Sequence, residues 1–293
     1  MITRLLVRYY RVIKAYLIVN EPRILTGIFF KLVSMLDRGF SQRRLTKPQI
    51  LARTLWKQNY ILKYNNKAPY ALVCDKYIAD NSDDYKFPRG AIYDSSVNVK
   101  FNLKLYQLLN YNPSIKILDL GCAGGGLVKS FLEDGITAIG VEGSNISKKL
   151  RSGEWDSCPY HLFTCDITEN FSINSHVGEK VLFDVVTAWE VLEHITEKKI
   201  EPLILNIIDN LRSKGYFIGS VDKLPDANPN IGAVYHHTLK SKEWWLDKFQ
   251  KFGFSEVLDH PFKTEDYVRG NGIGIKNWDP IDGTGFHLVL KKD

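Results

Sequence analysis

The chain has 293 residues, of which 44% are hydrophobic and 25% are charged, and its formal net charge is +6. This composition is ordinary for a soluble globular protein with a full core, so we expect one large domain with additions. The four cysteines, at positions 74, 122, 158 and 165, lack Cys-x-x-Cys spacing, which argues against a disulfide framework and favours free thiols in a reducing compartment.

The N-terminal segment carries the positive charge. Residues 1–60 contain twelve lysines and arginines and two acidic residues, a net charge of +10, so the remainder carries −4. Residues 2–19 show helical spacing with a basic stripe, and Pro22 is suited to open a second helix. We expect either a helical hairpin on an anionic membrane surface through residues 1–40, or helices that pack on the main domain or on a second copy in a homo-oligomer.

The sequence also allows an expectation about where in the cell the protein is located. No uncharged run approaches the roughly 20 residues that span a bilayer, and no small-residue cleavage site closes a signal peptide. The arginine-rich start resembles an organelle transit peptide, but its continuing helical pattern argues against one. We therefore expect a cytoplasmic protein that is at most peripheral to a membrane.

The stretch at 116–126 is the one around which the rest is organised. A buried strand that contains Asp119 leads into small residues from Gly121 to Gly126, and a helical pattern follows. A strand, a glycine turn and a helix bring a nucleotide-like ligand against bare backbone. Gly121, Ala123 and Gly126 approach the dinucleotide pattern, but Asp119 would then lie close to a pyrophosphate. S-adenosylmethionine is a cation, so this carboxylate favours it instead.

The same stretch resembles the first motif of class I S-adenosylmethionine-dependent methyltransferases, because it reads Leu118-Asp119-Leu120-Gly121-Cys122-Ala123-Gly124-Gly125. The usual pattern is Asp-x-Gly-x-Gly-x-Gly. Ala123 replaces the middle glycine, which slightly narrows the turn. The resemblance implies that the cofactor contacts Asp119, Gly121, Cys122, Ala123 and Gly125.

Strand and helix patterns alternate from residue 115 onward. Strands are predicted at 115–120, 137–142, 161–165, 182–188, 215–220, 255–259 and 285–291. Helices are predicted at 125–134, 145–151, about 191–212 and 240–252. The alternation predicts an α/β fold with a doubly wound, mostly parallel seven-stranded sheet. The lack of a helix between the last two strands matches the antiparallel end of a methyltransferase sheet.

We expect the chain to consist of two parts. Residues 1–85 would form a basic helical extension, and 86–293 the methyltransferase domain with a substrate-side insertion at 260–284. Aromatic, amide and charged side chains in this insertion would suit a sugar, through ring stacking and hydrogen bonds to hydroxyls. They are Tyr267, Arg269, Asn271, Trp278 and Asp279.

The second strand ends in a candidate ribose site. Glu142 lies 21 residues after Gly121, at a strand end where an acid accepts both ribose hydroxyls of an adenosine. Gly143 and Ser144 follow it in the same candidate site, and Ser144 is expected to cap the next helix.

The resemblance implies further cofactor contacts. In the family, an acid at the end of the third strand accepts from the adenine amino group and the next residue packs on the ring, which implies Asp166 and Ile167. It also implies that Trp189 lies near the cofactor. Arg89, in a loop predicted at 85–90, is a candidate partner for the cofactor carboxylate.

The segment after the fourth strand resembles the E-V-L-E-H segment of the ubiquinone-pathway O-methyltransferases. If a helix begins near residue 190, Glu190, Glu193 and His194 share one face. Adjacent carboxylates repel, so we expect a helix N-terminus or a divalent cation such as Mg²⁺ to offset them. The pattern also resembles small-RNA 3′-end 2′-O-methyltransferases, which implies a metal site of Glu190, Glu193, His194 and a later histidine. His237, in the pair that follows the fifth strand, is the candidate.

Both a metal site and a metal-free acid–base site remain open for these four side chains, as does a structural cap. In either active case the reaction is methyl transfer to a hydroxyl, which needs a base or a metal to become nucleophilic. We expect an O-methyltransferase acting on a hydroxyl of a glycan, a sugar precursor or a lipid-linked intermediate.

Two alternatives remain. One is an RNA 2′-O-methyltransferase that uses the basic segment on phosphates, although base-specific aromatic–basic patterning is absent. The other is a non-catalytic nucleoside-binding module, against which the intact set of Asp119, Glu142 and Asp166 argues.

Overall fold

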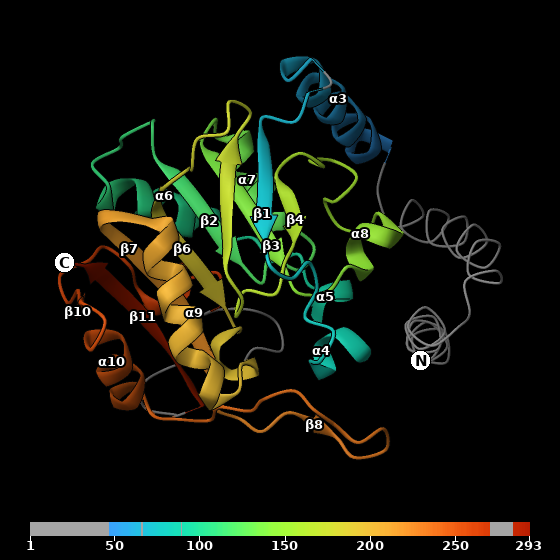
Figure 1. The fold of residues 1–293 in the computed structure, drawn as a ribbon. Helices are drawn as coiled ribbons and strands as arrows, with labels where there is room; N and C mark the ends of the chain where they lie inside the picture. The colour runs from blue at the N-terminus through green and yellow to red at the C-terminus, as the bar shows by residue number, and fades with distance from the viewer. Residues whose placement is uncertain (1–46, 66, 89, 270–283) are drawn as a thin grey trace.

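A computed structural model describes residues 47–65, 67–88, 90–269 and 284–293 (Figure 1). Several predictions lie outside these residues, namely the basic helices of residues 1–40, Arg89, Asn271, Trp278 and Asp279. Among the helices that are described, none is long and apolar enough to cross a membrane.

A seven-stranded sheet in the order β10-β11-β7-β6-β2-β3-β4 forms the centre of the fold. Its parallel strands are β2 (Lys116–Leu120), β3 (Thr137–Glu142), β4 (Leu162–Thr164), β6 (Phe183–Trp189) and β7 (Leu211–Asp222). β11 (Gly285–Lys292) is antiparallel to β7, and β10 (Phe254–Glu256) is antiparallel to β11. The predicted mostly parallel seven-stranded sheet is confirmed, including its antiparallel end.

Helices cover both faces of the sheet, because its strands carry apolar side chains on both sides. Along β6, Val186 belongs to one core and Val185 to the other. Leu203 of α9 packs into the first core, and Phe131 of α7 packs into the second. Figure 1 shows α9 in front of the sheet. The covering helices are α6 (Val99–Leu108), α7 (Gly126–Glu133), α9 (Glu197–Asn210) and α10 (Lys242–Gln250), whereas α8 (Ile146–Leu150) packs against Ala91 and Ile92 in a separate cluster.

The helix predicted over about 191–212 is interrupted. Leu192–His194 form a 3-10 turn, η1, and α9 begins at Glu197. The helix cannot begin near residue 190, because β6 runs to Trp189 and Glu190 then takes a left-handed conformation with φ of 54°. The prediction that Glu190, Glu193 and His194 share a helical face is therefore wrong.

Several short elements were not predicted. β1 (Tyr70–Cys74) pairs antiparallel with β5 (Phe171–Ser175), and β8 (Ala227–Asn228) pairs with β9 (Ala233–Val234) in a hairpin. α4 (Asp83–Lys86) and α5 (Gly90–Tyr93) lie at the two ends of the loop predicted at 85–90, and η2 (Thr264–Asp266) lies in the insertion. Elements this short carry too little periodicity to be read. The β1–β5 pairing crosses the domain boundary proposed at residue 85, which stays a prediction.

A buried histidine attaches α3 (Lys47–Lys63) to the edge of the sheet. The Tyr160 N–H donates to the Tyr60 hydroxyl oxygen over 3.1 Å, and that hydroxyl lies 2.6 Å from His161 Nδ1. The Tyr64 hydroxyl lies 3.4 Å from Nε2 of the same ring. Two phenols thus contact both nitrogens of a side chain that is 1% exposed. Burial lowers the pKa of His161 to about 3.

We expect acid to destabilise the fold through His161. Its pKa is near 6.5 in an unfolded chain and about 3 in the fold, so the unfolded state takes up the proton first. Stability is therefore unaffected by this ring above pH 6.5 and falls as the pH drops below it. Between pH 6.5 and 5.5 the loss is about 1 kcal/mol. Urea unfolding of the parent and of His161→Phe checks this: the variant should lose less stability over that interval, and equal pH slopes would contradict the prediction.

Candidate active site

The turn after β2 closes tightly because two of its glycines take left-handed conformations. The φ angle is 68° at Gly121 and 79° at Gly125, a region that other residues enter only at a cost. A Cβ on Gly121 would lie 2.4 Å from Cγ2 of Val191. The N–H groups of Gly121 and Cys122 donate to the Val141 carbonyl of β3 over 2.8 and 3.0 Å. The turn therefore lies directly against the end of the neighbouring strand.

Ala123 stands where the methyltransferase pattern has a glycine, and it takes a glycine's conformation. Its φ angle of 45° costs an alanine about 1–2 kcal/mol. Its N–H donates to Glu142 Oε2 over 2.9 Å, and its carbonyl accepts from Trp155 Nε1 over 2.8 Å. These two hydrogen bonds hold the turn in place despite the substitution.

Glu142 is fixed by backbone groups at the end of β3. Besides the bond from Ala123, its Oε1 accepts from the Ser144 N–H over 2.9 Å. Burial raises the pKa of Glu142, and the two backbone hydrogen bonds oppose that rise. The residue lines a cavity beside Gly143, where a ribose-binding acid was predicted. Ser144 Oγ accepts from the Ile146 N–H over 3.3 Å, but the N-cap residue of α8 is Asn145, so Ser144 lies one residue before the cap that was predicted for it.

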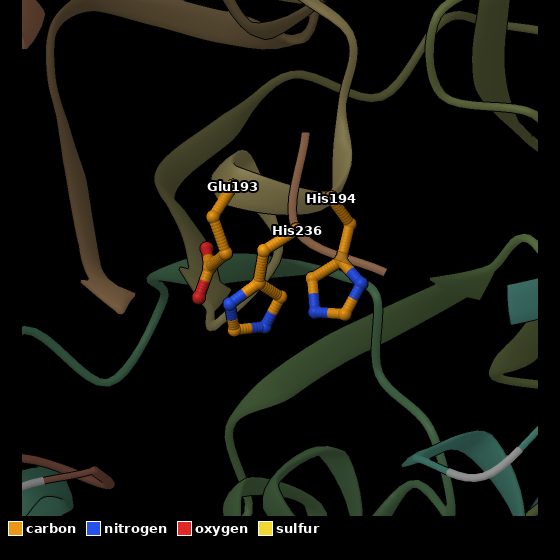
Figure 2. Close-up of side chains that lie close together, drawn as sticks. All are labelled: Glu193, His194 and His236. Carbon is orange, nitrogen blue, oxygen red and sulfur yellow. The ribbon is translucent and has the colours of Figure 1, made fainter. Parts of the chain in front are cut away.

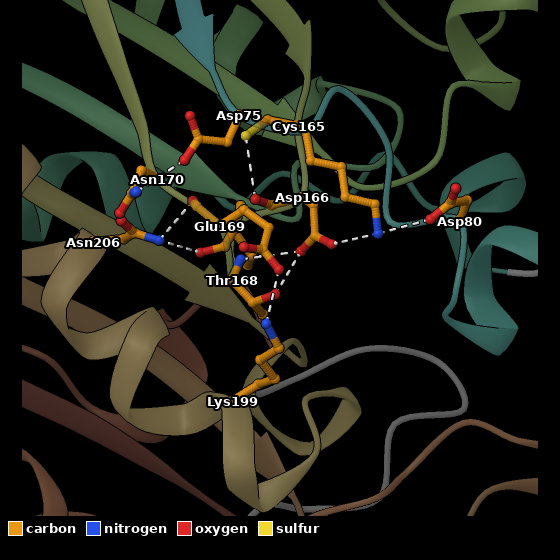
Figure 3. A network of polar contacts seen from close by, with 11 residues as sticks. Asp75, Asp80, Cys165, Asp166, Thr168, Glu169, Asn170, Lys199 and Asn206 are labelled. Atoms are coloured by element: carbon orange, nitrogen blue, oxygen red, sulfur yellow. Dashed lines mark hydrogen bonds and ion pairs between the residues drawn. The ribbon is translucent and has the colours of Figure 1, made fainter.

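Asp166, just after β4, accepts hydrogen bonds within a turn (Figure 3) and also lines the cavity. Its Oδ1 accepts from the N–H and the hydroxyl of Thr168 over 3.1 and 2.7 Å. Its Oδ2 lies 3.3 Å from Lys76 Nζ, which also pairs with Asp80. Ile167 lines the cavity beside it. The predicted contacts of these two residues with adenine stay predictions.

Asp119 is buried within β2 and is not among the described residues that line the cavity. The Thr187 hydroxyl donates to its Oδ1 over 2.7 Å. Burial raises its pKa to about 7, and this hydrogen bond opposes the rise. Cys122, Gly125 and Ser144 are likewise outside the lining. These four residues support the site from behind its wall.

The cavity, of about 290 Å³, lies at the carboxyl ends of the parallel strands, where ligands of open α/β sheets bind. The predicted residues that line it are Gly121, Ala123, Glu142, Gly143, Asp166, Ile167, Trp189, Glu190 and His194. Lining residues that the sequence did not reveal include Asp84, Asp94, Asp222, Asp226, Tyr235 and His236. Apart from Asp222, which ends β7, they come from short helices and loops, whose place in space has no periodic signal.

Two histidine rings lie side by side next to this cavity (Figure 2). The ring centroids of His194 and His236 are 4.7 Å apart. His194 Nδ1 lies 2.7 Å from Asp84 Oδ2, and His236 Nδ1 lies 2.6 Å from the Leu224 carbonyl oxygen. In each ring, Nε2 is therefore the nitrogen left to bind a ligand.

Glu193 completes a group of three potential metal ligands with these histidines. One ligand atom from each residue lies within 4.8 Å of the others. Glu193 Oε1 accepts from the Asp222 N–H over 2.9 Å, whereas its buried Oε2 has no hydrogen-bond partner in the part of the chain that is described. A buried acceptor without a partner is costly. Two imidazoles and a carboxylate, with the far ring nitrogens held by an acid and a carbonyl, fit a divalent cation.

The charges in this cluster depend on one another. Burial lowers the pKa of His194, but the hydrogen bond and charge of Asp84, with the charges of Glu193 and Glu190, outweigh it and give a pKa of about 9. Burial raises the pKa of Glu193 to about 7 and that of Glu190 to about 8. A cation needs the neutral ring and the ionised carboxylate, so its binding here would release protons.

The second histidine of the cluster, beside His194, is His236. The prediction that named His237 as this ligand is therefore wrong. His237 is exposed, and its N–H donates to the Glu193 carbonyl over 2.7 Å. Neighbouring side chains of an extended segment point in opposite directions, so only one of the pair reaches the cluster. Glu190 is also not among its three ligands, because its left-handed backbone directs it elsewhere along the cavity.

The described part of the insertion packs into the core. Tyr267 is 5% exposed, and its ring stacks on His287 at 3.9 Å and on Phe262 at 5.1 Å between centroids. The prediction that Tyr267 stacks on a sugar is therefore wrong. Arg269 lines the cavity.

The strand order, the glycine turn and the acids at the strand ends define a class I methyltransferase. A family model described as "Methyltransferase domain" matches residues 96–260, more than half of the chain, and the chain belongs to this family. The predicted class I S-adenosylmethionine-dependent methyltransferase is thus confirmed, with S-adenosylmethionine as its cofactor.

Individual proteins are similar to parts of the chain. "Ubiquinone biosynthesis O-methyltransferase, mitochondrial" from Schizosaccharomyces pombe is 21% identical over 182 residues, which are 62% of this chain and 65% of that relative's length. The glycopeptide N-methyltransferase MtfA, solved with S-adenosyl-L-methionine, matches at 13% identity and a TM-score of 0.44, over 66% of this chain and 94% of its own. An S-adenosylmethionine-dependent methyltransferase from Clostridium acetobutylicum matches at 13% identity and a TM-score of 0.46, over 67% and 92%.

Gly121→Ala should weaken both the fold and cofactor binding. Its Cβ would enter a left-handed position and meet Val191 at 2.4 Å, which we expect to cost about 1–3 kcal/mol. The double variant Gly121→Ala/Val191→Ala removes the clash but keeps the backbone strain, so it should recover part of the affinity. Urea unfolding and calorimetric titration with S-adenosylhomocysteine measure the two effects, with Val191→Ala as control. Unchanged affinity in the single variant would show that the turn does not hold the cofactor.

Proposed function

We propose that this methyltransferase transfers a methyl group to a hydroxyl, with the help of a divalent cation held by Glu193, His194 and His236. The observation that carries the proposal is the buried Glu193 Oε2 without a partner, next to two imidazoles whose Nδ1 atoms are already engaged. A cation at this place would lower the pKa of an acceptor hydroxyl. A neutral amine acceptor is nucleophilic without such help.

The residues of the cavity would divide the remaining work. Glu142 and Asp166 would hold the adenosine part of the cofactor, which supplies a methyl group on a sulfonium. Trp189 would pack near it, and Glu190 would accept the proton of the hydroxyl, for which a pKa raised to about 8 by burial is suited. Alignment of acceptor and donor can account for roughly 7–11 kcal/mol of the barrier.

The acceptor we propose is a hydroxyl of a glycan, a sugar precursor or a lipid-linked intermediate. Two neighbouring sugar oxygens can approach one cation together, which suits a site with three protein ligands and open positions. The name of the S. pombe relative, an O-methyltransferase, supports transfer to oxygen. Association of residues 1–40 with a membrane surface would bring a cytoplasmic enzyme to lipid-linked acceptors, and it belongs to the same proposal.

The charge of the cavity supports an uncharged acceptor over RNA. Its described lining contains Arg269, two histidines and many more acids, which are Asp84, Asp94, Glu142, Asp166, Glu190, Asp222 and Asp226. Such a wall repels phosphates, so we place RNA 2′-O-methylation second.

The neighbouring histidines provide a matched test of the cation site. His236→Ala should lower the affinity for a divalent cation by roughly 10- to 100-fold, because it removes a ligand, and His237→Ala should leave it unchanged. Calorimetric titration with Mg²⁺, Mn²⁺ and Zn²⁺ in the presence of S-adenosylhomocysteine measures this. Equal effects of the two substitutions, or no cation binding by the parent, would exclude the site.

The acceptor class is tested by methylation assays with S-adenosylmethionine and mass spectrometry. The panel consists of free sugars, a lipid-linked oligosaccharide, a small amine and a short RNA. We expect one added methyl group on a saccharide, loss of activity with EDTA and recovery on adding a divalent cation. Methylation of RNA alone would favour the second function, and methylation of the amine alone, insensitive to EDTA, would overturn the proposal.

A further inference from the structure

Arg269 reaches the cofactor cavity from the C-terminal part of the chain. Its side chain is 15% exposed and forms an ion pair with Asp94, which lies between α5 and α6. Its Nε lies 3.5 Å from Oε2 of Glu190, at the end of β6. Three segments that are far apart in the sequence thus meet at one guanidinium.

The fold fixes the position of this arginine. His287 of β11 places Nε2 2.5 Å from the Arg269 carbonyl oxygen. The Asn98 side-chain amide donates to three carbonyl oxygens just before it, those of Glu265, Asp266 and Tyr267, over 3.1, 3.1 and 2.8 Å. Backbone anchors on both sides therefore hold the guanidinium at the cavity wall.

Asp94, the ion-pair partner of this guanidinium, is equally well fixed. Its Oδ1 accepts from the N–H and the hydroxyl of Ser96 over 2.9 and 2.6 Å. Its carbonyl accepts from the Gly124 N–H over 2.8 Å, which ties it to the glycine turn. The ion pair thus joins the C-terminal segment to the turn that shapes the cofactor site.

One donor of this arginine has no acceptor. Arg269 Nε is buried and makes no hydrogen bond in the part of the chain that is described, and the Glu190 oxygen at 3.5 Å does not supply one. A buried charged donor without a partner is costly. A carboxylate is the group whose two oxygens best match a guanidinium, so a carboxylate that enters the cavity would remove this cost.

The strand order indicates which end of the cofactor lies here. Asp166, Glu142 and Gly121 follow β4, β3 and β2, and Glu190 follows β6, which is the next strand in the sheet. With adenine at Asp166 and ribose at Glu142, the methionine part extends over Gly121 toward Glu190 and Arg269.

The charges agree with this direction. Asp94 brings a negative charge and Arg269 a positive charge, and they form an ion pair. S-adenosylmethionine has a sulfonium, an ammonium and a carboxylate. Its methionine part would therefore place the ammonium near Asp94 and the carboxylate on the guanidinium.

We propose that Arg269 binds the α-carboxylate of the cofactor's methionine part, while Asp94 receives its ammonium. This role replaces the sugar contact predicted for Arg269, and it is the one that the sequence suggested for Arg89. It rests on the cofactor placement of the proposed function, and it does not depend on the acceptor or on the cation.

Two ligands that differ by the amino-acid end separate this role from a structural one. S-adenosylhomocysteine carries the carboxylate, whereas 5′-methylthioadenosine keeps the adenosine and the sulfur but lacks the amino acid. Arg269→Gln should lower the affinity for S-adenosylhomocysteine by roughly 10- to 100-fold, the range of a charge-assisted pair. The affinity for methylthioadenosine should stay unchanged. Arg269→Lys keeps the charge without the planar fork, so its loss should be intermediate. Calorimetry, with methylthioadenosine measured by displacement, gives both affinities.

Arg212→Gln is the matched control, because Arg212 is an exposed arginine that pairs with Asp184 at the far end of the sheet. It should change neither affinity. If Arg269→Gln lost the same factor of affinity for both ligands, the arginine would only hold Asp94 and Glu190 in place, and this would overturn the proposal. Unchanged affinities for both would overturn it as well. Failure of the acceptor or cation proposals would leave this comparison intact, because neither ligand reacts.

Discussion

The carboxylate of Glu142 joins the two turns on which the cavity depends. One oxygen accepts from Ala123 in the turn after β2, and the other accepts from Ser144 in the turn after β3. The parallel register of the two strands, with Leu120 opposite Val141, brings these turns to the same level. The φ of 45° at Ala123 is strained, so its turn needs the hydrogen bond that the Ala123 N–H donates to the Glu142 carboxylate. The acid that we expect to bind ribose is thus also the one that holds the glycine turn in shape.

Two strained backbone positions lie at the same cavity. Ala123 and Glu190 are non-glycine residues with positive φ, at the ends of the adjacent strands β2 and β6. The Glu190 N–H is held by the hydroxyl and the carbonyl of Ser220 on β7, each at 3.2 Å. Strained residues persist where the surroundings over-determine them. Here the central sheet supplies that constraint.

The features that follow from local sequence patterns, such as β3 and the glycine turn, could be predicted from the sequence. The bounds of β3 were predicted to the residue, because a parallel strand buried on both faces is a continuous apolar run between turn signals. The glycine turn was equally clear. His236 and His237 could not be told apart, because the direction of a side chain in an irregular segment depends on where the preceding strand ends. The helical spacing of Glu190 and Glu193 was misleading, since β6 continues to Trp189 and the chain then turns.

For other residues, the sequence gives no signal of their place in the site. Asp84, Asp94 and Arg269 lie in short or irregular segments, and they reach the cavity through contacts that span much of the chain. His194 meets Asp84 across 110 positions, and Arg269 meets Asp94 from the far C-terminal segment. Such pairs arise from the packing of layers and not from local periodicity, so they are visible only in the fold.

The raised pKa values of the site have one common cause. Burial raises the pKa of Asp119, Glu142, Glu190 and Glu193, because these carboxylates have left water without enough cations to compensate them. Replacing them by apolar residues would remove that cost, so packing does not explain their presence. A cationic cofactor does, and a divalent cation beside Glu193 would add to the same effect. The acidity is therefore shared by the cavity wall and the residues behind it, and it suits a ligand that carries positive charge.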